Sequence, residues 1–122
     1  MSIKILIVDD SATVRQQVRL ALQQAGFDIV EAVDGVDGIE KLSSHRDVRL
    51  VIADVNMPRM NGLEMVESIA KNPALNSVPI VMLTTEGNPD LVRRAKDAGA
   101  KGWIVKPFKA HLLVAAAQKL AA

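Results

Sequence analysis

The stretch that decides the fold reads IKILIVDDSATVRQQVRLALQQAGFDIVEA and covers residues 3–32. It opens with Ile3–Val8, whose apolar residues are mostly consecutive, a pattern typical of a strand covered on both faces. A helical segment follows between Ser11, a good N-cap residue, and Gly26, a helix stop. Its apolar residues recur at every fourth position: Val14, Val18 and Leu22. A second strand at Asp28–Ala32 completes a strand–helix–strand unit, which predicts parallel strands joined by a right-handed crossover.

The same unit repeats along the rest of the chain. Further strands are predicted at Leu50–Val55, Val78–Leu83 and Gly102–Val105. Apolar residues at helical spacing lie in the segments between and after the strands: Val36, Ile39 and Leu42; Leu63, Val66 and Ile69; Leu91, Ala95 and Ala98; and Leu112, Leu113, Ala116 and Leu120. The tripeptide Asn88-Pro89-Asp90 predicts the start of the fourth helix, with asparagine as the cap and proline at the first helical position.

Five strand–helix units fill the 122 residues, so we predict one (βα)₅ domain spanning residues 1–122. A closed barrel of such units usually needs about 250 residues. The length therefore favours an open, doubly wound parallel sheet with helices on both faces, a three-layer α/β/α arrangement.

Composition excludes several classes of function. The formal net charge is +1, from 15 basic and 14 acidic residues, so nothing indicates a nucleic-acid partner, which usually requires a basic stripe. The absence of cysteine excludes disulfides, zinc–thiolate sites, iron–sulfur clusters and thiol catalysis. No apolar run is long enough for a membrane span, and the first residues do not form a signal peptide. We therefore expect a cytoplasmic protein.

Polar residues stand where the predicted strands end. Asp9 and Asp10 follow the first strand, Asp54 ends the third, Thr84 follows the fourth and Lys106 follows the fifth. In an open α/β sheet the functional site lies beyond the carboxyl ends of the strands. Each residue alone has an ordinary explanation as a helix cap, a strand-end residue or a solvated lysine. If the strands are parallel, however, all of them converge on one pocket.

The chemistry of this pocket favours a divalent cation. Two carboxylates about 4 Å apart repel each other by about 4 kcal/mol at an effective dielectric constant of about 20. Three carboxylates and one ammonium group leave a formal charge of −2. Oxygen ligands without imidazole or thiolate point to Mg²⁺, with Mn²⁺ as the other candidate. A carboxylate beside such an ion suits the transfer of a phosphoryl group, with Asp54 as the nucleophile, Lys106 on a phosphate oxygen and Thr84 as a hydrogen-bond donor.

The motifs at these strand ends are those of a known family. They are Val8-Asp9-Asp10-Ser11, Asp54-Val55-Asn56-Met57-Pro58 through Asn61-Gly62, Leu83-Thr84-Thr85-Glu86, and Val105-Lys106-Pro107-Phe108. In this order and at these spacings the whole chain resembles the receiver domain of two-component response regulators. The resemblance implies the flavodoxin-like strand order 2-1-3-4-5, and it implies that a histidine kinase phosphorylates Asp54.

The resemblance also implies roles for the other site residues. Asp10 and Asp54 would bind Mg²⁺ through their side chains and Asn56 through its backbone carbonyl, while Asp9 would act mainly through water. Lys106 would hold the phosphate, and Thr84 would move toward it on activation.

The fifth strand carries a departure from the family pattern. The switch aromatic is normally Tyr or Phe, and this sequence has Trp103. Two alternatives stay open: the ring swings from exposed to buried when Thr84 moves, or it packs partly buried against the fourth helix in both states. In either case a buried indole N–H needs a hydrogen-bond partner. The resemblance also implies a cis peptide bond between Lys106 and Pro107.

Within the family the chain is most similar to stand-alone chemotaxis regulators of the CheY type, on the evidence of Arg15, Asn56 and Glu86 and because no output domain follows the last helix. That similarity implies a chemotaxis-type histidine kinase, a downstream target such as the flagellar motor switch, and a phosphatase as partners.

The expected output face comprises the fourth helix, the fifth strand and the fifth helix, with Arg93, Arg94, Lys96, Lys101, Trp103, Lys109 and Lys119. Its basic charge suggests an acidic partner segment, although a solvated helix face would look the same.

Other functions on such a fold fit less well. An aspartyl-phosphate phosphatase or transferase places two acids as Asp-x-Asp, and Asp54-Val55-Asn56 lacks the second. A flavin carrier needs a phosphate-binding loop after the first strand, where Asp9 and Asp10 would repel phosphate. We therefore expect no enzymatic activity beyond phosphotransfer to Asp54 and its dephosphorylation. A phosphorelay intermediate, a phosphate sink and an interaction module that works without phosphorylation stay open as alternatives.

Overall fold

The structure is a computed structural model that describes residues 2–121. Strands and helices alternate along the chain: β1 Lys4–Val8, α1 Ala12–Gln24, β2 Asp28–Ala32, α2 Gly35–Ser44, β3 Val48–Ala53, α3 Gly62–Ala70, β4 Ile80–Thr84, α4 Pro89–Asp97, β5 Gly102–Val105 and α5 Ala110–Leu120. The predicted number, type and order of elements are confirmed. No helix within residues 2–121 combines the length and the apolar character needed to cross a bilayer.

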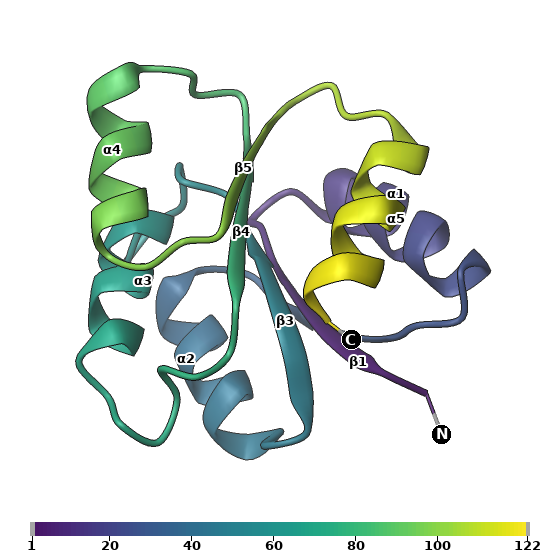
Figure 1. Cartoon of the computed structure of the whole chain (residues 1–122), viewed down its shortest axis with the longest axis horizontal. Helices are drawn as coiled ribbons and strands as arrows, with labels where there is room; N and C mark the ends of the chain where they lie inside the picture. The colour runs from purple at the N-terminus through teal and green to yellow at the C-terminus, as the bar shows by residue number, and fades with distance from the viewer. Residues whose placement is uncertain (1, 122) are drawn as a thin grey trace.

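The strands form one parallel sheet in the order β2-β1-β3-β4-β5. Helices α1 and α5 cover one face of this sheet, and α2, α3 and α4 cover the other (Figure 1). The doubly wound, three-layer arrangement and the strand order are therefore confirmed. Because all strands are parallel, their carboxyl ends lie along the same edge of the sheet.

Each face of the sheet has its own apolar core. Leu6 and Val8 of β1 pack with residues of α2, α3 and α4, whereas Ile5 and Ile7 pack with residues of α1 and α5. Successive residues of a strand point to opposite faces, so a strand covered on both sides needs apolar residues at every position. This is the physical basis of the consecutive apolar runs in the sequence.

Two strand positions were predicted wrongly. β3 is Val48–Ala53, not Leu50–Val55, because Val48 already pairs with β1 and the chain turns away at Asp54. β4 is Ile80–Thr84, not Val78–Leu83. There the preceding Pro79 has no N–H to donate, although its carbonyl accepts a bond from Val51.

The predicted helix caps are confirmed, whereas the predicted apolar face of α5 differs in part. Ser11 caps α1 by accepting from the Val14 N–H, and Asn88 caps α4 with Pro89 at its start, both as predicted. In α5 the buried residues are Leu113 and Ala117, whereas Leu112 is 53% exposed. On α5 only Leu113 of the two adjacent leucines faces the core, and the sequence alone did not show which one does.

Candidate functional site

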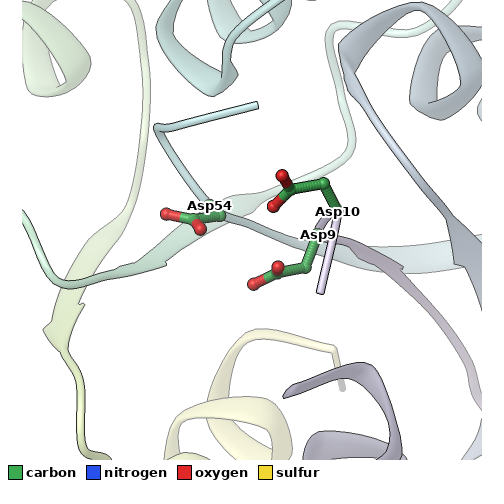
Figure 2. Close-up of side chains that lie close together, drawn as sticks. All are labelled: Asp9, Asp10 and Asp54. Carbon is green, nitrogen blue, oxygen red and sulfur yellow. The ribbon is translucent and has the colours of Figure 1, made fainter. Parts of the chain in front are cut away.

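Three carboxylates meet at the carboxyl edge of the sheet. Asp9 and Asp10 follow β1, and Asp54 follows the neighbouring strand β3, so the side chains lie close together (Figure 2). One oxygen from each of the three lies within 4.8 Å of the others. Asp9 and Asp54 are buried, whereas Asp10 is exposed. The predicted convergence of these acids is confirmed.

Lys106 reaches the cluster from the outermost strand of the sheet. It follows β5, and its Nζ reaches Asp9 Oδ2 at 2.8 Å and Asp54 Oδ2 at 3.1 Å. The expected cis peptide between Lys106 and Pro107 is present. One ammonium group therefore contacts carboxylates from two different strands.

Burial and charge act against each other in this cluster. Burial raises the pKa of Asp9 above its usual value, although the Lys106 ammonium and the Ser11 N–H act in the opposite direction. Burial alone would lower the pKa of Lys106, but its contacts with Asp9 and Asp54 outweigh this effect and raise it. Lys106 therefore stays protonated at neutral pH, while the burial that raises the pKa of Asp9 disfavours its ionised form.

Backbone contacts orient Asp54. Its Oδ1 accepts from the Val55 N–H at 2.7 Å while Oδ2 accepts from Lys106. Its own N–H donates to the Val8 carbonyl at 3.0 Å, which continues the β1–β3 ladder. The Asp54 carboxylate is thus fixed at the end of the buried strand β3, in contact with the Lys106 ammonium group.

The donor set fits a hard divalent cation. Three carboxylate oxygens come together with no histidine or cysteine in the cluster, and Lys106 balances only part of their charge. Asn56 lies two residues beyond Asp54, and its side-chain amide donates to Glu86 Oε1 at 3.0 Å. Its backbone carbonyl as a metal ligand stays a prediction.

The predicted switch residues contact each other through Glu86. Thr84 is fully buried, and its Oγ1 accepts from the Glu86 N–H at 3.3 Å. The Trp103 indole N–H donates to the Glu86 carbonyl at 2.9 Å. The ring is half-buried and packs against the apolar core beneath α4. The indole therefore has the partner that its burial requires, and whether it changes rotamer stays a prediction.

Two contacts near the site were not anticipated from sequence. Arg15 donates to the Asp9 backbone carbonyl and to Glu31, and so ties the end of β1 to β2. Arg59, in the loop after Asp54, forms a bidentate ion pair with the buried Asp34. Neither pair lies at a regular sequence spacing, so no periodic signal could have indicated it.

On the predicted output face, one of the basic residues is engaged in an ion pair. Arg94 turns toward α3 and pairs with Glu67 at 2.7 and 2.9 Å, so its charge is partly neutralised there. Lys96, Lys101 and Trp103 line a cavity of about 180 Å³ between α4 and β5. Two apolar side chains are also exposed on this face, Val105 at 50% and Leu112 at 53%.

Comparison with known proteins gives consistent matches. The family described as Response regulator receiver domain matches residues 5–118. "Chemotaxis protein CheY1" of Helicobacter pylori is 41% identical over 111 residues, which are 90% of either chain. The structure of Vibrio cholerae chemotaxis protein CheY4 is 39% identical and superposes with a TM-score of 0.91 over 98% of this chain and 99% of that one.

A second similar structure is that of a complex. It is the CheX-CheY-BeF3-Mg+2 complex from Borrelia burgdorferi, in which the matched chain is 27% identical, with a TM-score of 0.91 over 98% of this chain and 90% of that chain.

Proposed function

The chain belongs to the response regulator receiver domain family, and from this membership we propose that it is a signalling protein controlled by phosphorylation of Asp54. The observation that carries the proposal is the contact of Lys106 with both Asp9 and Asp54, beside Asp10 and the buried Thr84. This set of acids, a lysine and a hydroxyl suits phosphoryl transfer to a carboxylate.

The proposed donor is a phosphohistidine on a histidine kinase. An oxygen of Asp54 attacks the phosphorus atom, a new O–P bond forms and the P–N bond to the imidazole breaks. The electron pair stays on the imidazole nitrogen, which takes a proton from solvent. The product is an acyl phosphate on Asp54, which water later cleaves to aspartate and inorganic phosphate. In chemical terms the protein catalyses only its own modification.

Each neighbouring residue has a defined task in this reaction. Asp9, Asp10 and Asp54, together with the Asn56 backbone carbonyl, would hold Mg²⁺, and the ion would neutralise charge on the transferring phosphoryl oxygens. Lys106 already contacts Asp54 and can follow the phosphoryl group as a point charge. The carboxyl edge of the sheet therefore provides both the nucleophile and the compensating positive charge.

The phosphoryl group would then change the output face. It adds nearly two negative charges and strong acceptor oxygens beside Thr84, whose hydroxyl would turn to donate to it. The Glu86 N–H would lose its Thr84 acceptor, and Trp103 is bonded to the same Glu86. The signal would thus pass from Asp54 to the surface formed by α4, β5 and α5 as a shift between two populated states.

The similar proteins named for chemotaxis support a role in chemotaxis and motility control. We propose a chemotaxis-type histidine kinase as the donor and a downstream protein such as the flagellar motor switch as the target, with a phosphatase to end the signal. The exposed lysines of the output face favour an acidic segment on that target. The family match covers most of the chain, which supports a single receiver domain over residues 1–122.

The test is the intact mass after incubation with acetyl phosphate and Mg²⁺. We expect a single phosphoryl adduct on the wild type, and none on Asp54→Asn or in the presence of a chelator. If no adduct forms, beryllofluoride with Mg²⁺ provides a second test, followed by the fluorescence of Trp103, the single tryptophan of the chain. No response in either experiment would overturn the phosphorylation proposal and favour an interaction module that works without it.

A further inference from the structure

A third buried carboxylate, Asp34, lies outside the acidic cluster. It is 3% exposed and caps α2 by accepting from the Asp37 N–H at 2.8 Å. Arg59 approaches the same carboxylate with two guanidinium nitrogens, Nε at 2.7 Å from Oδ2 and Nη2 at 3.1 Å from Oδ1. This planar, bidentate arrangement is the strong form of an arginine–carboxylate contact. It joins the β2–α2 corner to the loop that follows Asp54.

The backbone at Arg59 is held in an unfavourable conformation. Its φ angle is +62°, in the left-handed region that non-glycine residues seldom adopt. The next residue, Met60, accepts from the Gly35 N–H at 2.9 Å, and a Cβ atom on Gly35 would lie 2.6 Å from that carbonyl oxygen. Two adjacent residues of the loop are therefore fastened to the start of α2 at close range.

These contacts bear on the loop of residues 56–61. The loop closes on itself, because the Gly62 N–H donates to the Val55 carbonyl at 2.9 Å. At the start of the loop, the Asn56 side chain donates to the Glu86 carboxylate. Asn56 is also the residue expected to offer a backbone carbonyl to the metal. The direction of that carbonyl depends on where the rest of the loop is anchored.

We propose that the Asp34–Arg59 ion pair positions loop 56–61 for Mg²⁺, and that Arg59 is a positioning residue for the metal site. The inference rests on the proposed function, since it concerns the affinity of the same acidic cluster for its ion. Contacts that orient metal ligands from outside commonly change metal affinity by about 10- to 100-fold. Arg59 lies three positions along the backbone from Asn56, the expected ligand. We therefore expect a smaller change in Mg²⁺ affinity, of about three- to tenfold.

The obvious alternative is that the ion pair only stabilises α2. Asp34→Asn keeps the helix cap and removes only the charged fork, because asparagine caps a helix as well as aspartate does but cannot form that fork with Arg59. Arg59→Gly removes the fork from the other partner and leaves the Asp34 cap in place. It removes the guanidinium, but glycine accepts a positive φ without strain, so the backbone is relieved.

The experiment is a calorimetric titration of the unphosphorylated full chain with Mg²⁺. We expect Arg59→Gln, Arg59→Gly and Asp34→Asn to bind Mg²⁺ about three- to tenfold more weakly than the wild type. Arg59→Lys, which keeps the charge but loses the fork, should recover part of the affinity. Arg94→Gln is the matched control, because it breaks another bidentate pair, with Glu67 at 2.7 and 2.9 Å, on the far side of α3. It should bind like the wild type.

The outcomes separate the inference from the function it rests on. If the wild type gives no Mg²⁺ binding, the proposed function fails and the positioning role fails with it. If the wild type binds and the Arg59 and Asp34 variants bind equally well, only the positioning role is overturned. A loss in Arg94→Gln of the same size would also overturn it. Thermal unfolding of each variant in chelator shows whether it is folded. Arg59→Gly should bind Mg²⁺ more weakly than the wild type without a matching fall in Tm.

Discussion

The indole nitrogen of Trp103 donates a hydrogen bond to the backbone carbonyl of Glu86 at 2.9 Å. The same residue donates its N–H to Thr84 Oγ1, and its carboxylate accepts from Asn56. Glu86 therefore connects β5, the end of β4 and the loop after Asp54. A change at any of these positions must break or rebuild a contact with Glu86, so this residue is the physical link in the proposed switch.

Trp103→Phe tests the first of these contacts. Phenylalanine keeps an aromatic ring but has no N–H, so the Glu86 carbonyl loses its donor. We expect a loss of about 1 kcal/mol in the free energy of unfolding, measured with urea. We also expect faster hydrogen exchange at the Glu86 amide, whose N–H donates to Thr84 Oγ1, and unchanged exchange at Gly99, which follows α4 at its other end. Equal exchange at the Glu86 amide in both proteins would show that the bond does not restrain the loop.

Thr84→Val tests the second contact. Valine has nearly the shape of threonine but lacks the hydroxyl, and the site is fully buried. Asp54 and Lys106 are untouched, so the phosphoryl adduct should still form. The Trp103 fluorescence change with beryllofluoride and Mg²⁺ should be lost, since no hydroxyl can turn toward the mimic. Thr84→Ser, which restores the hydroxyl, should recover it. A full response in Thr84→Val would remove Thr84 from the switch.

Gly62→Ala tests how closely Asp54 is packed. A Cβ atom on Gly62 would lie 2.0 Å from the Asp54 carbonyl oxygen and 2.9 Å from its carbonyl carbon. Backbone atoms at the end of a buried strand cannot move aside, so we expect a loss of about 3 kcal/mol or more, or failure to fold. Gly87→Ala is the control, since nothing lies within 4 Å of its Cβ position, and it should change stability by less than about 0.5 kcal/mol. The free energy of unfolding of both variants, measured with urea, tests this prediction.

Much of this architecture follows from local sequence. Consecutive apolar residues predict strands covered on both faces, and Ser11 and Asn88 mark helix starts that the structure confirms. The edge of the sheet at which Asp9, Asp10 and Asp54 meet also follows, because it depends only on the strands being parallel. The resemblance to receiver domains supplied the strand order, which local patterns do not contain.

What the sequence did not predict depends on contacts between distant residues. The ends of β3 and β4 are set by pairing with their neighbours and by Pro79. Apolar runs alone therefore placed β3 two residues too late at both ends, and β4 two residues too early at its start and one too early at its end. The Asp34–Arg59 pair joins residues 25 positions apart, and Arg59 has a positive φ angle that its residue type does not suggest. Such details are decided by tertiary packing.

Asp9→Asn tests the balance between burial and charge in the acidic cluster, with a chelator present to remove metal. Burial raises the pKa of folded Asp9 above the unfolded value of 3.8, so ionised Asp9 destabilises the fold at neutral pH. The substitution should therefore raise Tm at pH 7. As the pH falls through the raised pKa toward 3.8, the folded wild type takes up its proton first and the difference should shrink.

Asp34→Asn is the control for this experiment and should behave in the opposite way. Hydrogen bonds from Arg59 and from the Asp37 N–H lower the pKa of Asp34 below 3.8, so its ionised form stabilises the fold at every pH above that value. The variant should have a lower Tm at pH 7, and the deficit should close only when the pH falls below 3.8 toward the folded pKa. If both variants shifted Tm in the same direction at pH 7, the two carboxylates would not differ in the way that their contacts indicate.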